Sequence, residues 1–136
     1  MPLVRIDTLT GYSQVDLDAI GDGVHRALVQ AIGIPVADRF QVIAQHSASG
    51  LVFDTGYLGI QRTPGIVFVQ ITLSVGRTLE QKRALYAALV RNLSDDPGVR
   101  SEDVFVNLVE VEKENWSFGN GIAQYASTVQ PPASPV

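Results

Sequence analysis

The sequence predicts an α/β protein in which two β-α-β units form a four-stranded sheet with two helices on one face. Three observations predict this fold. Two apolar runs, residues 2–9 and 66–73, have the composition of strands. Each run is followed by a turn and an amphipathic helix. The second half of the chain also repeats the first at a constant offset of 65 residues.

The first unit contains a strand, a helix and a second strand. A strand over residues 2–9 leads through a turn to Ser13, which is an expected helix N-cap. Gly33 is the expected end of the helix. Residues 39–45 then predict a second strand. The apolar helix residues recur at three- and four-residue spacing: Leu17, Ile20, Val24, Leu28 and Ile32.

The segment between the two units is rich in turn-forming residues. Leu51–Phe53 is a candidate short strand. Residues 54–65 contain four glycines or prolines, which predict a loop or a hairpin.

The repeat keeps strand, turn, cap, helix and second strand in register between the halves. Eight pairs of identical or similar residues align at the same offset: Val4 and Val69, Ile6 and Ile71, Gly11 and Gly76, Ser13 and Thr78, Ala19 and Ala84, Gly33 and Gly98, Asp38 and Asp103, Phe40 and Phe105. We expect one domain, residues 1–136, with repeat 1 at about 2–46, repeat 2 at about 67–111 and an extended tail at about 126–136. Each unit should have parallel strands and a right-handed crossover.

The repeat leaves the relative direction of the first and third strands open. If they are parallel, Arg77 lies a full strand length from Pro2, about 25 Å at ~3.3 Å per residue. If they are antiparallel, as a two-fold axis between the halves would make them, Arg77 lies beside Pro2.

The strand over residues 66–73 is almost continuously apolar, which is typical of a strand covered on both faces. Two helices cover only one face. We therefore expect another copy of the chain to cover the other face, in a homo-oligomer. The alternative is a monomer whose tail folds across the sheet.

The C-terminal region contains an aromatic and glycine-rich cluster over residues 115–121. Trp116 and Phe118 are expected in the core, at an interface or in a pocket wall. Ile122–Tyr125 is a candidate short strand or hairpin that caps a site. The last residues are rich in proline and predict an extended tail.

Composition excludes several classes of protein. No cysteine and only two histidines argue against disulfides and metal sites, and no cofactor is expected. A net charge of −4 lacks the basic surface typical of nucleic-acid binding. No run of eighteen apolar residues predicts a membrane span, and residues 1–10 do not resemble a signal peptide. The expected location is the cytoplasm.

Met1-Pro2 is the first candidate for chemistry. Initiator methionine is usually removed before a small residue, which would leave Pro2 with a free secondary amine. Such an amine can act as a base, a cation or a nucleophile, depending on its pKa. The repeat places Pro2 opposite Val67 and Arg77 opposite Tyr12. The chemical candidates are therefore differences between two otherwise similar halves.

Several motifs together resemble the tautomerase superfamily, whose members use an amino-terminal proline on a duplicated β-α-β scaffold. Within it, the sequence is most similar to the malonate semialdehyde decarboxylases, over nearly the whole chain up to about Tyr125. The motifs are Met1-Pro2-Leu3, Pro35-x-x-Asp38-Arg39-Phe40-Gln41, Gln45-His46, Asp54-Thr55-Gly56, Gly76-Arg77-Thr78-x-Glu80-Gln81-Lys82 and Trp116-Ser117-Phe118-Gly119-x-Gly121.

The resemblance implies a homotrimer and assigns roles to residues of this chain. It implies that Pro2 is the catalytic amine, Asp38 its acidic partner and Arg77 the arginine that binds the substrate carboxylate. The chain departs from the pattern at Val75, where the decarboxylase has a first arginine. A second cation is then expected from Arg39, from Arg62 or from a neighbouring subunit; the alternative is that the substrate is held differently.

The expected activity is decarboxylation of a small 3-oxo acid such as malonate semialdehyde, with possible hydratase activity. Arg77, Arg39, Trp116 and Phe118 are the expected substrate-binding residues. The alternatives are a keto-enol tautomerase of phenylpyruvate type or an unsaturated-acid hydratase on the same site. A protein-binding member of the fold without catalysis is a third possibility.

Structural roles compete with these assignments. Asp38 precedes a strand, as its counterpart Asp103 does, so both are candidate turn residues. Arg77 begins a helix, where the helix dipole disfavours a cation, so a functional role is favoured. His25 and His46 are expected to be structural.

Overall fold

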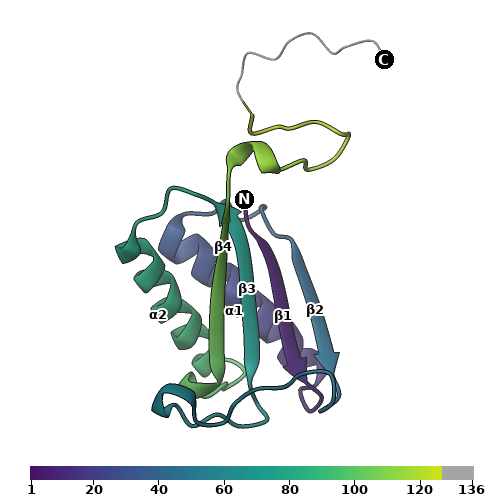
Figure 1. Ribbon diagram of the computed structural model, residues 1–136, viewed down its shortest axis with the longest axis vertical. Coiled ribbons are helices and arrows are strands. Elements are labelled where there is room, and N and C mark those ends of the chain that lie inside the picture. Colours follow the sequence, from purple (N-terminus) through teal and green to yellow (C-terminus); the bar gives the residue numbers. More distant parts are fainter. Residues whose placement is uncertain (127–136) are drawn as a thin grey trace.

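The computed structural model describes residues 1–126 and contains one four-stranded sheet with two helices on one face (Figure 1). The main elements are β1 (Leu3–Leu9), α1 (Gln14–Ile32), β2 (Gln41–His46), β3 (Val67–Ser74), α2 (Leu79–Asp95) and β4 (Val104–Val111). The strand order is β2-β1-β3-β4. β1 pairs in parallel with β2, β3 pairs in parallel with β4, and β1 pairs antiparallel with β3.

The expected helix signals act as the sequence predicts. The side chain of Ser13 accepts a hydrogen bond from the backbone N–H of Asp16 at 3.1 Å. Gly33 ends α1 in the left-handed conformation, with φ of 70°, which glycine adopts without steric cost. Thr78, the counterpart of Ser13 in the repeat, caps α2 through its side chain; Gln81 completes a reciprocal capping box that is not among the expected signals. Among residues 1–126, no helix has both the length and the apolar character needed to cross a membrane.

The core lies between the sheet and the two helices. Its strand residues alternate along β1 and β3, and its helix residues face them. The helices approach closely at Gly23, where an added Cβ would lie 3.0 Å from a methyl group of Leu93. The buried side chain of Asn92 donates to the carbonyl of Gly23 at 3.1 Å. The largest fully buried side chains include Ile6, Ile20, Leu28, Ile71, Leu85, Leu89 and Leu93.

The opposite face of the sheet is not covered by any helix in the described part of the chain (Figure 1). Large apolar side chains are exposed on it, including Leu3, Val42 and Phe105 at 43–47%. Phe68 of β3 contacts Phe105 of β4, with ring centroids 5.1 Å apart. The nearly continuous apolar character of β3 therefore corresponds to one face that is buried within the chain and one that is available to a partner.

Two predicted strands are wrong. Leu51–Phe53 is irregular, and Val52 is 83% exposed, so no neighbouring strand pairs with this segment. The following loop includes a 3₁₀ turn, Tyr57–Gly59, and is held by three backbone carbonyls that accept from Arg62. Ile122–Tyr125 forms turns rather than a strand. The tail predicted at about 126–136 lies outside the described residues, except for Ala126.

The antiparallel pairing of β1 with β3 answers the question of strand direction. Leu3 lies opposite Thr72, so the start of β1 is beside the end of β3. Two further 3₁₀ turns, Ser101–Asp103 and Lys113–Asn115, precede and follow β4. The chain that follows the second of them, up to residue 126, lies above the N-terminal end of β1 in Figure 1.

Asp103 is predicted to stabilise the fold. Its carboxylate is 1% exposed and accepts from the backbone N–H and the hydroxyl of Thr63. Asp103→Ala should lower the free energy of unfolding by about 2–3 kcal/mol, because a buried N–H loses its acceptor. Urea denaturation at a fixed protein concentration measures this. Asp95→Ala, at an exposed position, is the control and should change stability little; equal stability of the two variants would contradict the assignment.

Candidate active site

Four segments meet at one end of the sheet. The backbone N–H of Val4 donates to the carbonyl of Phe40 at 3.0 Å, which places the segment before β2 next to the start of β1. The antiparallel pairing of β1 and β3 places residues 74–77 on the other side. The N–H of Val75 donates to the carbonyl of Val111 at 2.9 Å, so the chain after β4 also reaches this end.

The terminal amine lies beside Asp38. In the described chain this amine belongs to Met1, and it stands in for the Pro2 amine that removal of Met1 would expose. The Met1 nitrogen is 3.8 Å from Oδ2 of Asp38, and the two side chains are only 13% and 11% exposed. His25 supports the turn that carries Asp38, because its Nε2–H donates to the carbonyl of Val36 at 2.8 Å.

Asp38 and its repeat counterpart Asp103 have different surroundings. Both oxygens of Asp103 accept hydrogen bonds from Thr63. By contrast, Oδ1 of Asp38 is buried and has no hydrogen-bond partner among residues 1–126. Buried carboxylate oxygens without partners are costly and uncommon. The hydrogen bonds of Asp103 therefore explain its presence by a structural role. In contrast, Oδ1 of Asp38 can still accept a hydrogen bond from a ligand.

Burial and two neighbouring charges all act on the pKa of the terminal amine. Burial lowers its pKa below the ordinary 8.0, since the charged form loses hydration. The Asp38 carboxylate raises the pKa, and the positive charge of Arg77 lowers it further. The net effect is a lowered pKa, so the neutral amine is populated at lower pH than in a free chain.

Arg77 follows β3 and is partly buried. Its Nη1 donates to the carbonyl of Ser74 at 2.9 Å, and no carboxylate among residues 1–126 lies within 4.0 Å of its guanidinium. At the equivalent place in the first unit, the Tyr12 hydroxyl donates to the carbonyl of Gly65. Only the end with Pro2 therefore combines an amine, a carboxylate and an arginine.

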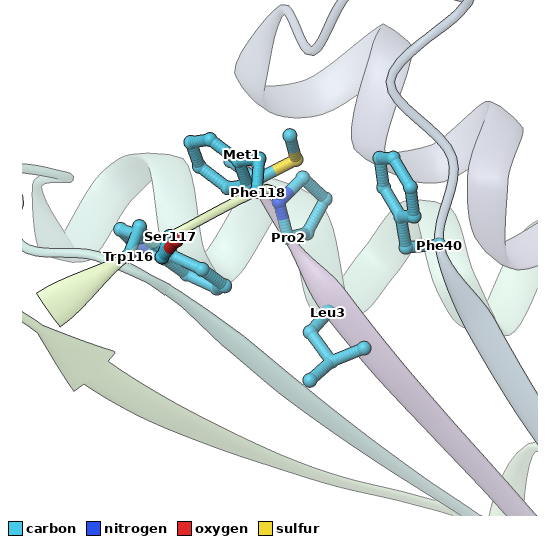
Figure 2. Close-up of a pocket in the computed structure, with 7 residues that line it drawn as sticks. All are labelled: Met1, Pro2, Leu3, Phe40, Trp116, Ser117 and Phe118. Atoms are coloured by element: carbon cyan, nitrogen blue, oxygen red, sulfur yellow. The ribbon is translucent and has the colours of Figure 1, made fainter. Parts of the chain in front are cut away.

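An apolar cavity of about 240 Å³ opens beside Pro2. Figure 2 shows Phe40 on one side of Pro2, with Trp116 and Phe118 from the segment after β4 on the other. The rings of Trp116 and Phe118 stack with centroids 5.5 Å apart. The indole N–H of Trp116 donates to the Ser74 hydroxyl at 3.0 Å, which fixes this wall to the end of β3.

A second cavity, of about 300 Å³, lies on the other side of Met1 and is polar. Its charged side chains are those of Arg77 and Lys113. Met1 lines both cavities, so an apolar space and a cationic one both lie next to the terminal residue. The other residues that line the polar cavity are Ser74, Val75, Gly76, Gln81 and Tyr125.

Two arginines expected to supply a second cation lie elsewhere, and His46 is structural as the sequence predicts. Arg39 forms an ion pair with Asp22 of α1 at 2.8 Å and lines neither cavity. Arg62 is bonded within its own loop. His46 bonds to Asp7 at 2.6 Å, at the far end of β1 and β2. The structure thus brings together Pro2, Asp38, Arg77, Trp116 and Phe118 but not Arg39.

The sequence interpretation missed three residues of the site. Ser74 anchors both Trp116 and Arg77, through its hydroxyl and its carbonyl. Gln124 clamps the aromatic segment, accepting from the N–H of Phe118 and donating to the carbonyl of Gly119, each at 3.0 Å. Lys113 lines the polar cavity. No local pattern marks any of them, since their roles arise from contacts between distant segments.

Comparison with known proteins agrees with this geometry. Two models described as tautomerase enzyme match residues 2–58 and 38–119. The chain belongs to the tautomerase family. It is 40% identical over 124 residues to the probable tautomerase YusQ of Bacillus subtilis (strain 168), covering 91% of this chain and 98% of the relative.

Solved structures of tautomerase-fold proteins are also similar. FG41 malonate semialdehyde decarboxylase inhibited by 3-bromopropiolate is 40% identical, with a TM-score of 0.85 over 90% of this chain and 93% of that one. A second malonate semialdehyde decarboxylase, described for its decarboxylase and hydratase activities, is 33% identical, with a TM-score of 0.84 over 90% and 95%. A fused 4-OT described as a symmetric trimer is 28% identical, with a TM-score of 0.73 over 88% and 94%.

Opposite charges next to the terminal amine predict opposite pKa changes. Arg77→Met should raise the pKa of the amine, because a nearby positive charge is removed and the ammonium is no longer repelled. Asp38→Asn should lower it, because the ammonium loses its anionic neighbour. A ¹⁵N NMR titration of the amine measures both. Lys82→Gln, which removes a cation paired with Glu110, is the control; shifts of the same sign in the Arg77 and Asp38 variants would contradict the geometry.

Proposed function

We propose that this tautomerase-family chain is a decarboxylase of a small 3-oxo acid such as malonate semialdehyde, and that Pro2 is its catalytic amine once Met1 is removed. One observation carries the proposal: an amine, a buried carboxylate and an arginine meet at one end of the sheet. Among residues 1–126, one oxygen of the carboxylate has no hydrogen-bond partner and the arginine has no carboxylate partner. The similarity to two malonate semialdehyde decarboxylases supports the choice of reaction.

Arg77 is the proposed carboxylate-binding residue. Its guanidinium is partly buried and held by the carbonyl of Ser74, so its planar donors are directed before the substrate binds. Binding there would place the rest of a three-carbon acid at the terminal amine, between the polar and the apolar cavities.

The amine is the proposed electron acceptor. In malonate semialdehyde, the bond between the carboxylate carbon and C2 breaks, and its electron pair moves toward the C3 carbonyl as carbon dioxide leaves. A protonated Pro2 would donate to the carbonyl oxygen. A neutral Pro2 would instead form an iminium with the aldehyde, releasing water. Proton addition at C2, with hydrolysis in the iminium route, then gives acetaldehyde.

Asp38 would adjust the protonation of this amine. Its carboxylate favours the ammonium form, and its free oxygen can also accept from a water molecule. Water held in this way supports hydration of an unsaturated acid as a side activity. Trp116 and Phe118 would form an apolar wall beside the reacting carbons. Carbon dioxide is neutral and apolar, so it is more favourable next to this wall than in water.

A keto-enol tautomerase of phenylpyruvate type is the second candidate, and a specific observation favours it. The pKa of the terminal amine is lowered, and a neutral amine is the form that abstracts a proton next to a carbonyl. The apolar cavity would receive an aromatic substituent, and Arg77 would again bind the carboxylate. The name of YusQ, a probable tautomerase, agrees with this reaction class.

The proposed assembly is a homotrimer. The helix-free face of the sheet exposes large apolar side chains from several strands, which is typical of an interface. The similar fused 4-OT is a symmetric trimer. Copies of this chain would cover the exposed sheet face in the same manner.

Decarboxylation by variants tests the reaction. Wild type should release carbon dioxide and acetaldehyde from malonate semialdehyde. Pro2→Ala and Arg77→Ala should each lower kcat/KM on the order of 10²-fold, because the first replaces the secondary amine of Pro2 by a primary amine outside the ring and the second removes the guanidinium that binds the carboxylate. Intact-mass analysis must show that Met1 is absent from each protein.

Arg83→Ala is the matched control, since Arg83 is an exposed arginine on α2 away from both cavities. It should retain wild-type kinetics. Full activity of Pro2→Ala would contradict the role of the secondary amine of Pro2, and retention of Met1 on active wild type would refute the amine mechanism. Tautomerisation of phenylpyruvate without decarboxylation would instead establish the second candidate.

Disruption of the open sheet face tests the assembly. Phe105→Glu should convert a trimer to a monomer, because a charge would be buried without a partner at the interface. Light scattering after size-exclusion chromatography measures the mass. Val15→Glu, at a position 77% exposed on α1, should remain trimeric. A wild-type monomer would rule the assembly out.

A further inference from the structure

We propose that Lys113 supplies a second cation for the substrate carboxylate, opposite Arg77. This inference rests on the proposed function, since it concerns how the same site binds its acid. The cation expected from Arg39 or Arg62 is absent from both cavities in the described part of the chain. Lys113 and Arg77 instead line one polar cavity of about 300 Å³.

Two tethers hold the segment that carries Lys113 over the end of β3. On one side, the N–H of Val75 donates to the carbonyl of Val111 at 2.9 Å. On the other side, the indole of Trp116 donates to the hydroxyl of Ser74 at 3.0 Å. Lys113 lies between these tethers, in the 3₁₀ turn Lys113–Asn115. Its backbone is therefore fixed close to residues 74–77.

The charges around this cavity leave both cations available. Among residues 1–126, no carboxylate lies within 4.0 Å of the side chains of Arg77 or Lys113. Glu112 and Glu114 flank Lys113 in the sequence but do not line the cavity. The other lysine of the chain, Lys82, is paired with Glu110 at 2.7 Å. Lys113 thus differs from Lys82 in having no carboxylate partner in the described part of the chain.

The remaining lining is compatible with a carboxylate. Val75 is 39% exposed and has no charge, so it cannot itself bind the carboxylate as a cation. Oε1 of Gln81 is engaged by the N–H of Thr78 at 2.9 Å, which leaves its amide N–H₂ as a donor. Arg77 would bind the carboxylate through its planar fork and Lys113 as a point charge. The ligand class is a small acid with a free carboxylate.

The two cations should affect binding more than the chemical step. A carboxylate bound between them is charged in the ground state, whereas its charge moves away as carbon dioxide forms. An interaction that is stronger in the ground state lowers KM without raising kcat. Removing Lys113 should therefore raise KM and leave kcat unchanged or slightly higher.

Steady-state kinetics with malonate semialdehyde tests the inference. Lys113→Gln should raise KM about tenfold, as expected for loss of one charge-assisted contact. Lys113→Arg should restore KM to near the wild-type value. Lys82→Gln is the matched control, because it removes the same charge from an ion pair outside the cavity, and its KM should equal that of wild type.

Calorimetric binding of malonate, which carries carboxylates but no aldehyde, separates this inference from the proposed reaction. Weaker malonate binding by Lys113→Gln but not by Lys82→Gln would support the inference, even if wild type does not decarboxylate malonate semialdehyde. If Lys113→Gln has the same KM and the same malonate affinity as wild type, the inference is wrong. In that case, decarboxylation by wild type would still support the proposed function. Absence of malonate binding by wild type would also overturn the inference.

Discussion

Antiparallel pairing between β1 and β3 is the constraint on which the site depends. Each β-α-β unit is parallel within itself, so this single antiparallel contact relates the two units by an approximate two-fold axis. It brings the first residues of β1 beside the end of β3 and thus brings Arg77 to the terminal amine. A parallel pairing would separate the same groups by the length of a strand.

The approximate symmetry creates two equivalent ends that have different chemistry. At one end, Asp103 accepts hydrogen bonds from Thr63, and Tyr12 donates to the carbonyl of Gly65. At the other end, Asp38 keeps a buried oxygen without a partner in the described chain. The same scaffold position therefore stabilises the fold in one half and leaves bonding capacity for a ligand in the other.

The amine connects the two proposed reaction classes. Burial and Arg77 lower its pKa, whereas Asp38 raises it. A protonated amine suits electrophilic assistance to decarboxylation, and a neutral amine suits iminium formation or proton abstraction. Small changes in the balance between one carboxylate and one guanidinium can therefore select among reactions on one fold, without a change in backbone.

The sequence by itself determined the repeat, both helices with their N-caps and the four main strands, because these depend on local periodicity and capping. The repeat pairs Gly98 with Gly33, but α2 ends earlier, at Asp95 with Asp96 as its C-cap. Comparing the halves also singled out Pro2 and Arg77. Only the tertiary structure decided the direction of β1 relative to β3. It also showed that Arg39 forms an ion pair with Asp22 and does not line the site. It alone showed that Lys113 shares a cavity with Arg77. Strand pairing and side-chain contacts join residues that are distant in the sequence, so local sequence patterns cannot predict these contacts.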